Sequence, residues 1–117
     1  MPHPGSIVLA DWRDGALPKE PNKLRPAVVI DGDRLFAPGY PYVLLVPLSA
    51  DEAMLIAALA VQLLPTAENG CTKACWAMSY LVTSTAKARI RATESRVTRE
   101  QLAEIRRQVA LAIGIEI

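Results

Sequence analysis

Short apolar runs alternate with polar, proline-containing connections along most of the chain, and this pattern is typical of short β-strands. Runs rich in valine, isoleucine and leucine predict strands over Ser6–Trp12, Arg25–Asp31, Tyr42–Leu48, Ala60–Leu64 and Ala74–Tyr80. A continuation of the last strand to Thr83 stays open. The alternation therefore predicts a protein built mainly from strands.

The connections carry weaker signals. Asp51–Ala58 follows a serine and opens with acidic residues, which predicts a short helix, although a buried strand fits the same run. Glu68–Gly70 contains Asn-Gly, a strong tight-turn signal. Ser84–Ala92 is basic and predicted to be irregular, with Ile90 as a possible anchor of a short strand.

The C-terminal segment contains the clearest element. Thr98-Arg99-Glu100-Gln101 is a capping-box sequence that predicts the start of a helix. Apolar residues then recur at helical spacing on one face: Leu102, Ile105, Val109, Ala112 and Ile113. Gly114 predicts the end of the helix, because glycine readily adopts the left-handed conformation there.

Five or six strands and one helix define the expected architecture. A single helix cannot cover both faces of so hydrophobic an open sheet, so we expect the sheet to curl into a small SH3-like β-barrel with the helix packed on it. The fold class is mainly β with a C-terminal helix (α+β). We expect one domain over residues 1–117, with a flexible tail at residues 1–5.

Composition narrows the class of protein. The net charge of +1 argues neither for nor against a nucleic-acid partner. Cys71, Cys75 and His3 are too few for a four-ligand structural zinc site, so we expect free thiols in a reducing cytosol, and neither metal nor cofactor. The apolar run Ala53–Val61 is too short to span a bilayer, and no signal peptide is recognisable. A soluble cytoplasmic protein is expected.

Arg25-Pro26 is the most informative chemical feature. Proline cannot donate a ladder hydrogen bond, so Pro26 belongs at the start or edge of its strand. Arg25 is then held at the mouth of the β-structure, after the polar loop Arg13–Leu24. Such a guanidinium suits phosphate recognition, whereas a surface ion pair with a carboxylate is the simpler alternative.

Several motifs occur in a familiar order. They are the opening strand Gly5–Trp12, Glu20 five residues before Arg25-Pro26, Val46-Pro47-Leu48-Ser49, Lys87-Ala88-Arg89, and the helix between Thr98 and Gly114. Together they resemble the MazF/PemK family of toxin endoribonucleases from bacterial toxin–antitoxin systems, over roughly Gly5 to Gly114. Three features depart from the family pattern: Ser49 replaces the usual threonine of V-P-x-T, Ser79-Tyr80 replaces an Asp-Gln pair, and the loop Leu17–Pro21 is unusually rich in proline.

The resemblance implies a CcdB/PemK-type barrel that acts as a homodimer on single-stranded RNA. The implied reaction is metal-independent: the ribose 2′-OH attacks the adjacent phosphate and leaves a cyclic phosphate and a 5′-OH. The implied partner is an antitoxin whose disordered acidic tail would occupy the RNA groove. No membrane partner is implied.

The same resemblance suggests roles for individual residues. Arg25 would stabilise the phosphorane, and Ser49, facing it from a neighbouring strand, would orient the phosphate. Glu20 is the candidate proton acceptor, although it could equally be a solvated carboxylate paired with a lysine. The candidate RNA-binding residues are Arg13, Lys19, Lys23, Lys87 and Arg89; each could instead be a solvated surface charge. Trp12 and Trp76 could stack bases or fill the core.

Two other readings stay open. The chain could keep this fold as a catalytically inactive PemK/CcdB-like module that binds a protein or a nucleic acid, which the Ser79-Tyr80 departure favours. It could also be an unrelated small barrel in which Arg25 forms a structural ion pair. The nuclease reading requires Arg25 and Ser49 to converge on one ligand.

Overall fold

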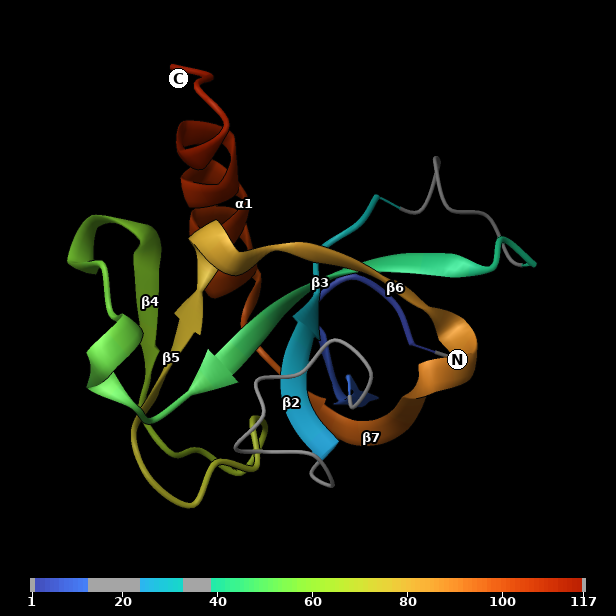
Figure 1. The fold of residues 1–117 in the computed structure, drawn as a ribbon. Coiled ribbons are helices and arrows are strands. Elements are labelled where there is room, and N and C mark those ends of the chain that lie inside the picture. The colour runs from blue at the N-terminus through green and yellow to red at the C-terminus, as the bar shows by residue number, and fades with distance from the viewer. Residues whose placement is uncertain (1, 13–23, 33–38, 117) are drawn as a thin grey trace.

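The computed structural model describes residues 2–12, 24–32 and 39–116 (Figure 1). Its strands are β1 (Ser6–Asp11), β2 (Leu24–Val29), β3 (Tyr42–Ser49), β4 (Ala60–Leu63), β5 (Cys75–Met78), β6 (Thr83–Ala86) and β7 (Ile90–Arg96). The single α-helix of the described residues is α1 (Arg99–Ala112). The class expected from the sequence, mainly β with a C-terminal helix, is confirmed.

The strands form one antiparallel sheet in the order β4-β5-β3-β2-β1-β7, and β6 also pairs with β3. The long strand β3 changes partner along one edge: Tyr42–Leu45 pair with β6, whereas Leu48 and Ser49 pair with β5. Figure 1 shows the sheet curving strongly around its centre, with α1 standing beside β4 and β5. The sheet curls as expected of a small barrel but is not closed, because β4 and β7 do not pair within the described residues.

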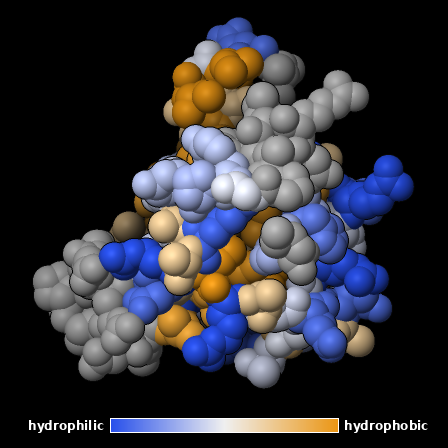
Figure 2. All heavy atoms as spheres, turned by 90° about the vertical axis from the view of Figure 1, so that its right-hand side faces the viewer, coloured by the Kyte–Doolittle hydropathy of each residue, from blue (hydrophilic) through white to orange (hydrophobic). Residues whose placement is uncertain are grey.

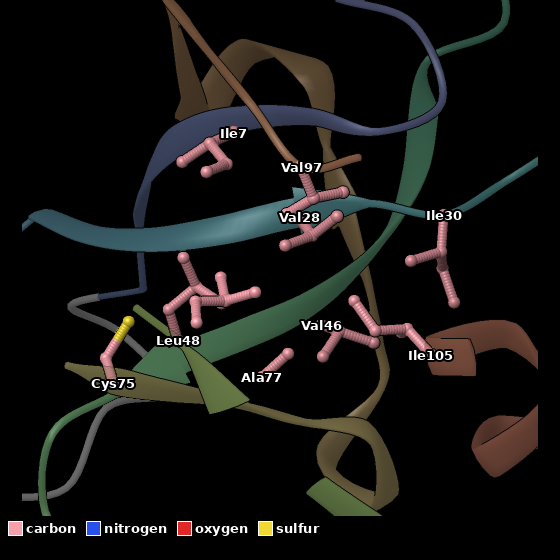
Figure 3. Close-up of a cluster of buried hydrophobic side chains, with 10 residues drawn as sticks. Ile7, Val28, Ile30, Val46, Leu48, Cys75, Ala77, Val97 and Ile105 are labelled. Atoms are coloured by element: carbon pink, nitrogen blue, oxygen red, sulfur yellow. The ribbon is translucent and has the colours of Figure 1, made fainter. Parts of the chain in front are cut away.

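Two apolar clusters lie on opposite faces of the sheet, because side chains alternate along each strand. On β1, Ile7 belongs to the first cluster, whereas Val8 and Ala10 belong to the second. In Figure 3, Ile105 of α1 reaches one side of the first cluster, and Cys75 lies at the other beside Leu48. The helix therefore covers one face only, and the curvature of the sheet encloses the second cluster.

The predicted helix boundaries are confirmed. The Thr98 hydroxyl accepts a hydrogen bond from the Gln101 main-chain N–H at 3.0 Å, and the Gln101 side chain accepts one from the Thr98 N–H at 2.9 Å. Gly114 has φ +92°, as expected after a helix end. Arg106 also ties α1 to the sheet: its guanidinium donates to the main-chain oxygens of Ile30 and Asp31, at 3.0 and 2.9 Å.

Three local predictions were wrong. The helix expected over Asp51–Ala58 is two short 3-10 helices, η1 (Glu52–Met54) and η2 (Ala57–Leu59), because so short a run gains little from α-helical hydrogen bonds. The strand expected to reach Tyr80 ends at Met78, where η3 (Ser79–Leu81) turns the chain toward β6. The basic segment is regular rather than irregular: it contains the end of β6, then η4 (Lys87–Arg89) and the start of β7, although the strand expected at Ile90 is confirmed.

The N-terminal residues lie against the sheet. Gly5 donates to the main-chain oxygen of Val29 at 2.7 Å and accepts from the N–H of Val97 at 2.9 Å. The flexibility expected for residues 1–5 stays a prediction.

Candidate functional site

Arg25 and Ser49 come together at the end of the β2–β3 pair. The two strands are antiparallel, with Ala27 opposite Pro47, and extending this register by two residues places Arg25 opposite Ser49. Both residues line a pocket of about 560 Å³, within the size range of small-ligand sites. The two residues that the nuclease hypothesis needs on one ligand therefore line the same pocket, and their catalytic roles stay predictions.

Ser49 is held by its surroundings. Its hydroxyl oxygen accepts a hydrogen bond from the Asp51 N–H at 3.0 Å, and the Asp51 carboxylate in turn accepts from the Ala53 N–H at 2.9 Å. The bond to Ser49 uses an oxygen lone pair, so the hydroxyl proton can still be donated to an anion in the pocket. The arrangement suits a hydroxyl that orients a phosphate oxygen.

The connection between β4 and β5 forms another wall of the pocket. Buried Asn69 organises it: its side-chain oxygen accepts from the N–H groups of Thr66 and Cys71, at 3.0 and 2.9 Å, and its amide donates to the Leu64 oxygen at 2.8 Å. Gly70 follows with φ +66°, and a Cβ there would lie 2.5 Å from the Ser95 hydroxyl oxygen. This tight turn brings the next residues to the pocket.

Sequence reasoning missed these wall residues. Cys71, Thr72 and Lys73 line the pocket together with Arg25, although they follow it by more than forty positions in the sequence. The Asn-Gly pair predicts the turn, but it does not predict that the turn lies beside Arg25 and Ser49. Long-range contacts bring the turn beside Arg25: Trp76 of β5 pairs with Ser49 of β3, and the Arg96 N–H of β7 donates to the Glu68 main-chain oxygen at 2.9 Å. Lys73 adds a second cation to the pocket.

Arg89 lies in a neighbouring pocket of about 530 Å³. This second pocket is lined by Asp11, Leu24, Arg89 and Arg91, and it shares Leu9 with the first. Arg89 also donates to the Asp11 main-chain oxygen at 3.4 Å. Lys87, at the start of η4, is not among the described residues that line either pocket. The structure therefore places Arg89 beside the Arg25 pocket rather than inside it.

The remaining candidates lie outside the described residues. They are the catalytic candidate Glu20 and the RNA-binding candidates Arg13, Lys19 and Lys23. Their roles stay predictions.

Ser79 and Tyr80 serve the fold. The Ser79 hydroxyl is fully buried and donates to the Gln108 side-chain oxygen at 2.7 Å, and the Gln108 amide donates to the Ala60 oxygen at 3.1 Å. The Tyr80 hydroxyl donates to the main-chain oxygen of Met54. The pair therefore joins α1 and the 3-10 helices to the sheet, and neither residue is among the described residues that line the Arg25 pocket.

The two tryptophans occupy different environments. Trp12 packs against the second apolar cluster and donates from its indole nitrogen to the Thr85 hydroxyl at 2.9 Å. This contact supports its reading as a core residue. Trp76 is half-buried on β5, opposite Ser49 in the strand pairing.

Other features of the described residues are few. No group of three or more His, Cys, Asp or Glu side chains there could hold a metal ion. None of the helices in the described ranges is both long and apolar enough to cross a membrane.

Both cysteines are free. Burial, together with the neighbouring Cys71, raises the pKa of Cys75 to about 12. On the face in Figure 2, hydrophilic residues surround a hydrophobic centre. Leu111 near the end of α1 is exposed, as are Ile113 and Ile115, which follow the helix.

These observations define a class: a small antiparallel β-fold with a C-terminal helix, whose pocket combines a guanidinium, a lysine and a serine hydroxyl. Comparison of the sequence with protein-family models finds a match over residues 3–113 to the PemK-like, MazF-like toxin of type II toxin–antitoxin systems. The chain belongs to this family. A search of curated proteins finds no match.

Several solved structures have a fold similar to that of this chain. The chain is similar to the Mycobacterium tuberculosis toxin MazF-mt6, with a TM-score of 0.72 and 13% identity, covering 96% of this chain and 99% of that one. It is also similar to an endoribonuclease solved with its cognate antitoxin from a mycobacterial species, with a TM-score of 0.75, 14% identity and coverage of 100% and 99%. MazF from Deinococcus radiodurans gives a TM-score of 0.73 and 17% identity, with 97% of each chain covered. At these identities, the likeness concerns the fold.

Proposed function

We propose that this toxin is an endoribonuclease that cleaves single-stranded RNA at the Arg25 pocket. The single observation that carries the proposal is that Arg25 and Ser49, from neighbouring strands, line one pocket. Membership of the MazF-like family and a fold neighbour described as an endoribonuclease support it. Lys73 in the same wall supplies further positive charge for a phosphodiester.

The reaction follows from the chemistry of these groups. The ribose 2′-OH loses its proton to a base, for which Glu20 is the candidate, and its oxygen attacks the adjacent phosphorus. The bond from phosphorus to the 5′ oxygen breaks, so a 2′,3′-cyclic phosphate and, after protonation, a 5′-OH remain. Arg25 donates two N–H bonds to the phosphorane oxygens, and Ser49 fixes one oxygen in place. No metal takes part in the proposed reaction.

The binding mode extends beyond the pocket. The second pocket adjoins the first at Leu9 and carries Arg89 and Arg91, so a strand of RNA crossing both would meet cations on each side. Arg13, Lys19, Lys23 and Lys87 are further candidates for backbone contacts. We further propose a cytoplasmic homodimer that is neutralised by a cognate antitoxin, as the complexed mycobacterial neighbour is bound to its own.

The proposal is tested by incubating purified protein with a long single-stranded RNA in EDTA and mapping the fragment ends. We expect discrete cuts with cyclic-phosphate and 5′-OH ends. Arg25→Ala should lower the cleavage rate by about 10²- to 10³-fold, the usual cost of losing one preorganised transition-state donor. Arg99→Ala removes an exposed arginine of α1 and is the matched control, with unchanged cleavage expected. Equal rates for Arg25→Ala and the parent would refute the assignment.

A second function has one observation in its favour. Ser79 stands where the family has an aspartate, and its hydroxyl is buried against Gln108, so any role of that aspartate toward RNA is absent here. The chain would then be an inactive module that binds a protein or a nucleic acid. RNA that binds but stays intact in the same assay would support this alternative.

A further inference from the structure

The Arg25 pocket contains a pair of thiols that the proposed reaction does not use. Cys71 and Cys75 both line it, and their sulfur atoms are 3.7 Å apart. We propose that these cysteines oxidise reversibly to a disulfide, and that the disulfide lowers the activity of the site. The first half is independent of the function, whereas the second half rests on the proposed nuclease activity.

The geometry favours bond formation. A disulfide joins its sulfurs at about 2.05 Å, so the two thiols need to approach by less than 2 Å in all. Cys75 is the first residue of β5 and pairs with Leu63 of β4. It is buried in the first apolar cluster, beside Leu48 in Figure 3. Cys71 is more exposed and lies outside the strands, after the Asn69-Gly70 turn. The adjustment therefore falls on the Cys71 side.

The chemistry needs a co-reactant, and a low-molecular-weight disulfide such as oxidised glutathione supplies it. The Cys71 thiolate attacks one sulfur, and one glutathione thiolate leaves. Cys75 sulfur then attacks Cys71 sulfur in the mixed disulfide, and its proton passes to the second departing glutathione. Two thiols are oxidised, and one glutathione disulfide is reduced to two glutathione thiols. Burial raises the pKa of Cys75 to about 12, so the first attack belongs to Cys71.

The bond would change the site because of what lies between the two cysteines. Thr72 and Lys73 also line the pocket, and a shift of Cys71 toward β5 moves this wall relative to Arg25 and Ser49. A displacement of about 1 Å in a positioning element can cost up to about 100-fold in rate. We expect oxidation to lower cleavage by about tenfold, with recovery on reduction.

The disulfide itself is tested by mass spectrometry. Reduced protein is incubated with oxidised glutathione, quenched in acid and weighed intact. We expect a loss of about 2 Da without a retained glutathione, and peptide mapping should join Cys71 to Cys75. Cys75→Ser should instead keep one glutathione on Cys71, because the resolving thiol is missing. Wild-type protein that remains a dithiol, or that stops as a glutathione adduct, would overturn the proposal.

The effect on the site is tested with the RNA cleavage assay. Oxidised wild type should cleave about tenfold more slowly than reduced wild type and recover in dithiothreitol, whereas Cys71→Ser should be insensitive to both reagents. Equal cleavage by the oxidised and reduced forms would overturn the switch and leave the nuclease function intact. A reduced protein that cleaves no RNA would overturn the nuclease function and the switch together, while the mass measurement still decides whether the disulfide forms.

Discussion

Removing the hydrogen bond between Ser79 and Gln108 tests whether Ser79 acts on stability or on RNA cleavage. The family resemblance in the sequence sets Ser79 at the position of an aspartate, so a substitution there could be expected to act on catalysis. In this structure, Ser79 is fully buried, is not among the described residues that line the pocket, and donates to the Gln108 oxygen at 2.7 Å. We therefore expect Ser79→Ala to lower stability and to leave RNA cleavage by folded protein unchanged.

The magnitude follows from burial. Gln108 is 4% exposed, so removing its donor leaves a side-chain oxygen away from water. The lost bond costs about 1 kcal/mol, and the stranded oxygen adds about 1 kcal/mol more, giving about 2 kcal/mol in the free energy of unfolding. At about 4 °C per kcal/mol for a domain of this size, the melting temperature should fall by about 8 °C.

Urea unfolding followed by tryptophan fluorescence measures the change, because the chain contains two tryptophans, Trp12 and Trp76. Ser84→Ala is the matched control: Ser84 is exposed on β6, and its replacement should change the free energy of unfolding by less than about 0.5 kcal/mol. The reasoning is refuted if Ser79→Ala behaves like this control. Cleavage that falls while stability holds would return Ser79 to the active site.

Two further predictions test the helix and the thiols. Thr98→Ala removes the hydroxyl that caps α1 and should destabilise the protein by about 1 kcal/mol in urea unfolding, whereas Thr98→Ser should retain most of the stability; equal losses in both variants would show that the cap is not the cause. Because the pKa of Cys75 is raised to about 12, its thiolate fraction at pH 9 should be about one in a thousand and should increase as the pH approaches 12. Iodoacetamide at pH 8 should therefore label Cys71 well before Cys75 in peptide mapping, and equal labelling rates would contradict the raised pKa.

Local patterns in the sequence determined most of the elements. The capping box at Thr98, the helix end at Gly114 and the strand positions of β1, β3 and β4 could all be predicted, because they depend on neighbours within a few residues. The family resemblance likewise depended on short motifs, and the family match over residues 3–113 confirms it. The predictions were wrong where a residue distant in the sequence determines the local conformation. The strand predicted through Tyr80 stops at Met78, since Ser79 hydrogen-bonds to Gln108 on α1.

The candidate site divides in the same way. Arg25 and Ser49 could be chosen from the sequence, because Arg-Pro and Val-Pro-Leu-Ser are local motifs at strand ends. The wall formed by Cys71, Thr72 and Lys73 could not be chosen, since long-range contacts with β3 and β7 bring it to the pocket. Along one edge, β3 pairs first with β6 and then, at its end, with β5. Local sequence thus determined which groups carry the chemistry, and the long-range pairing of strands decided which of them share a pocket.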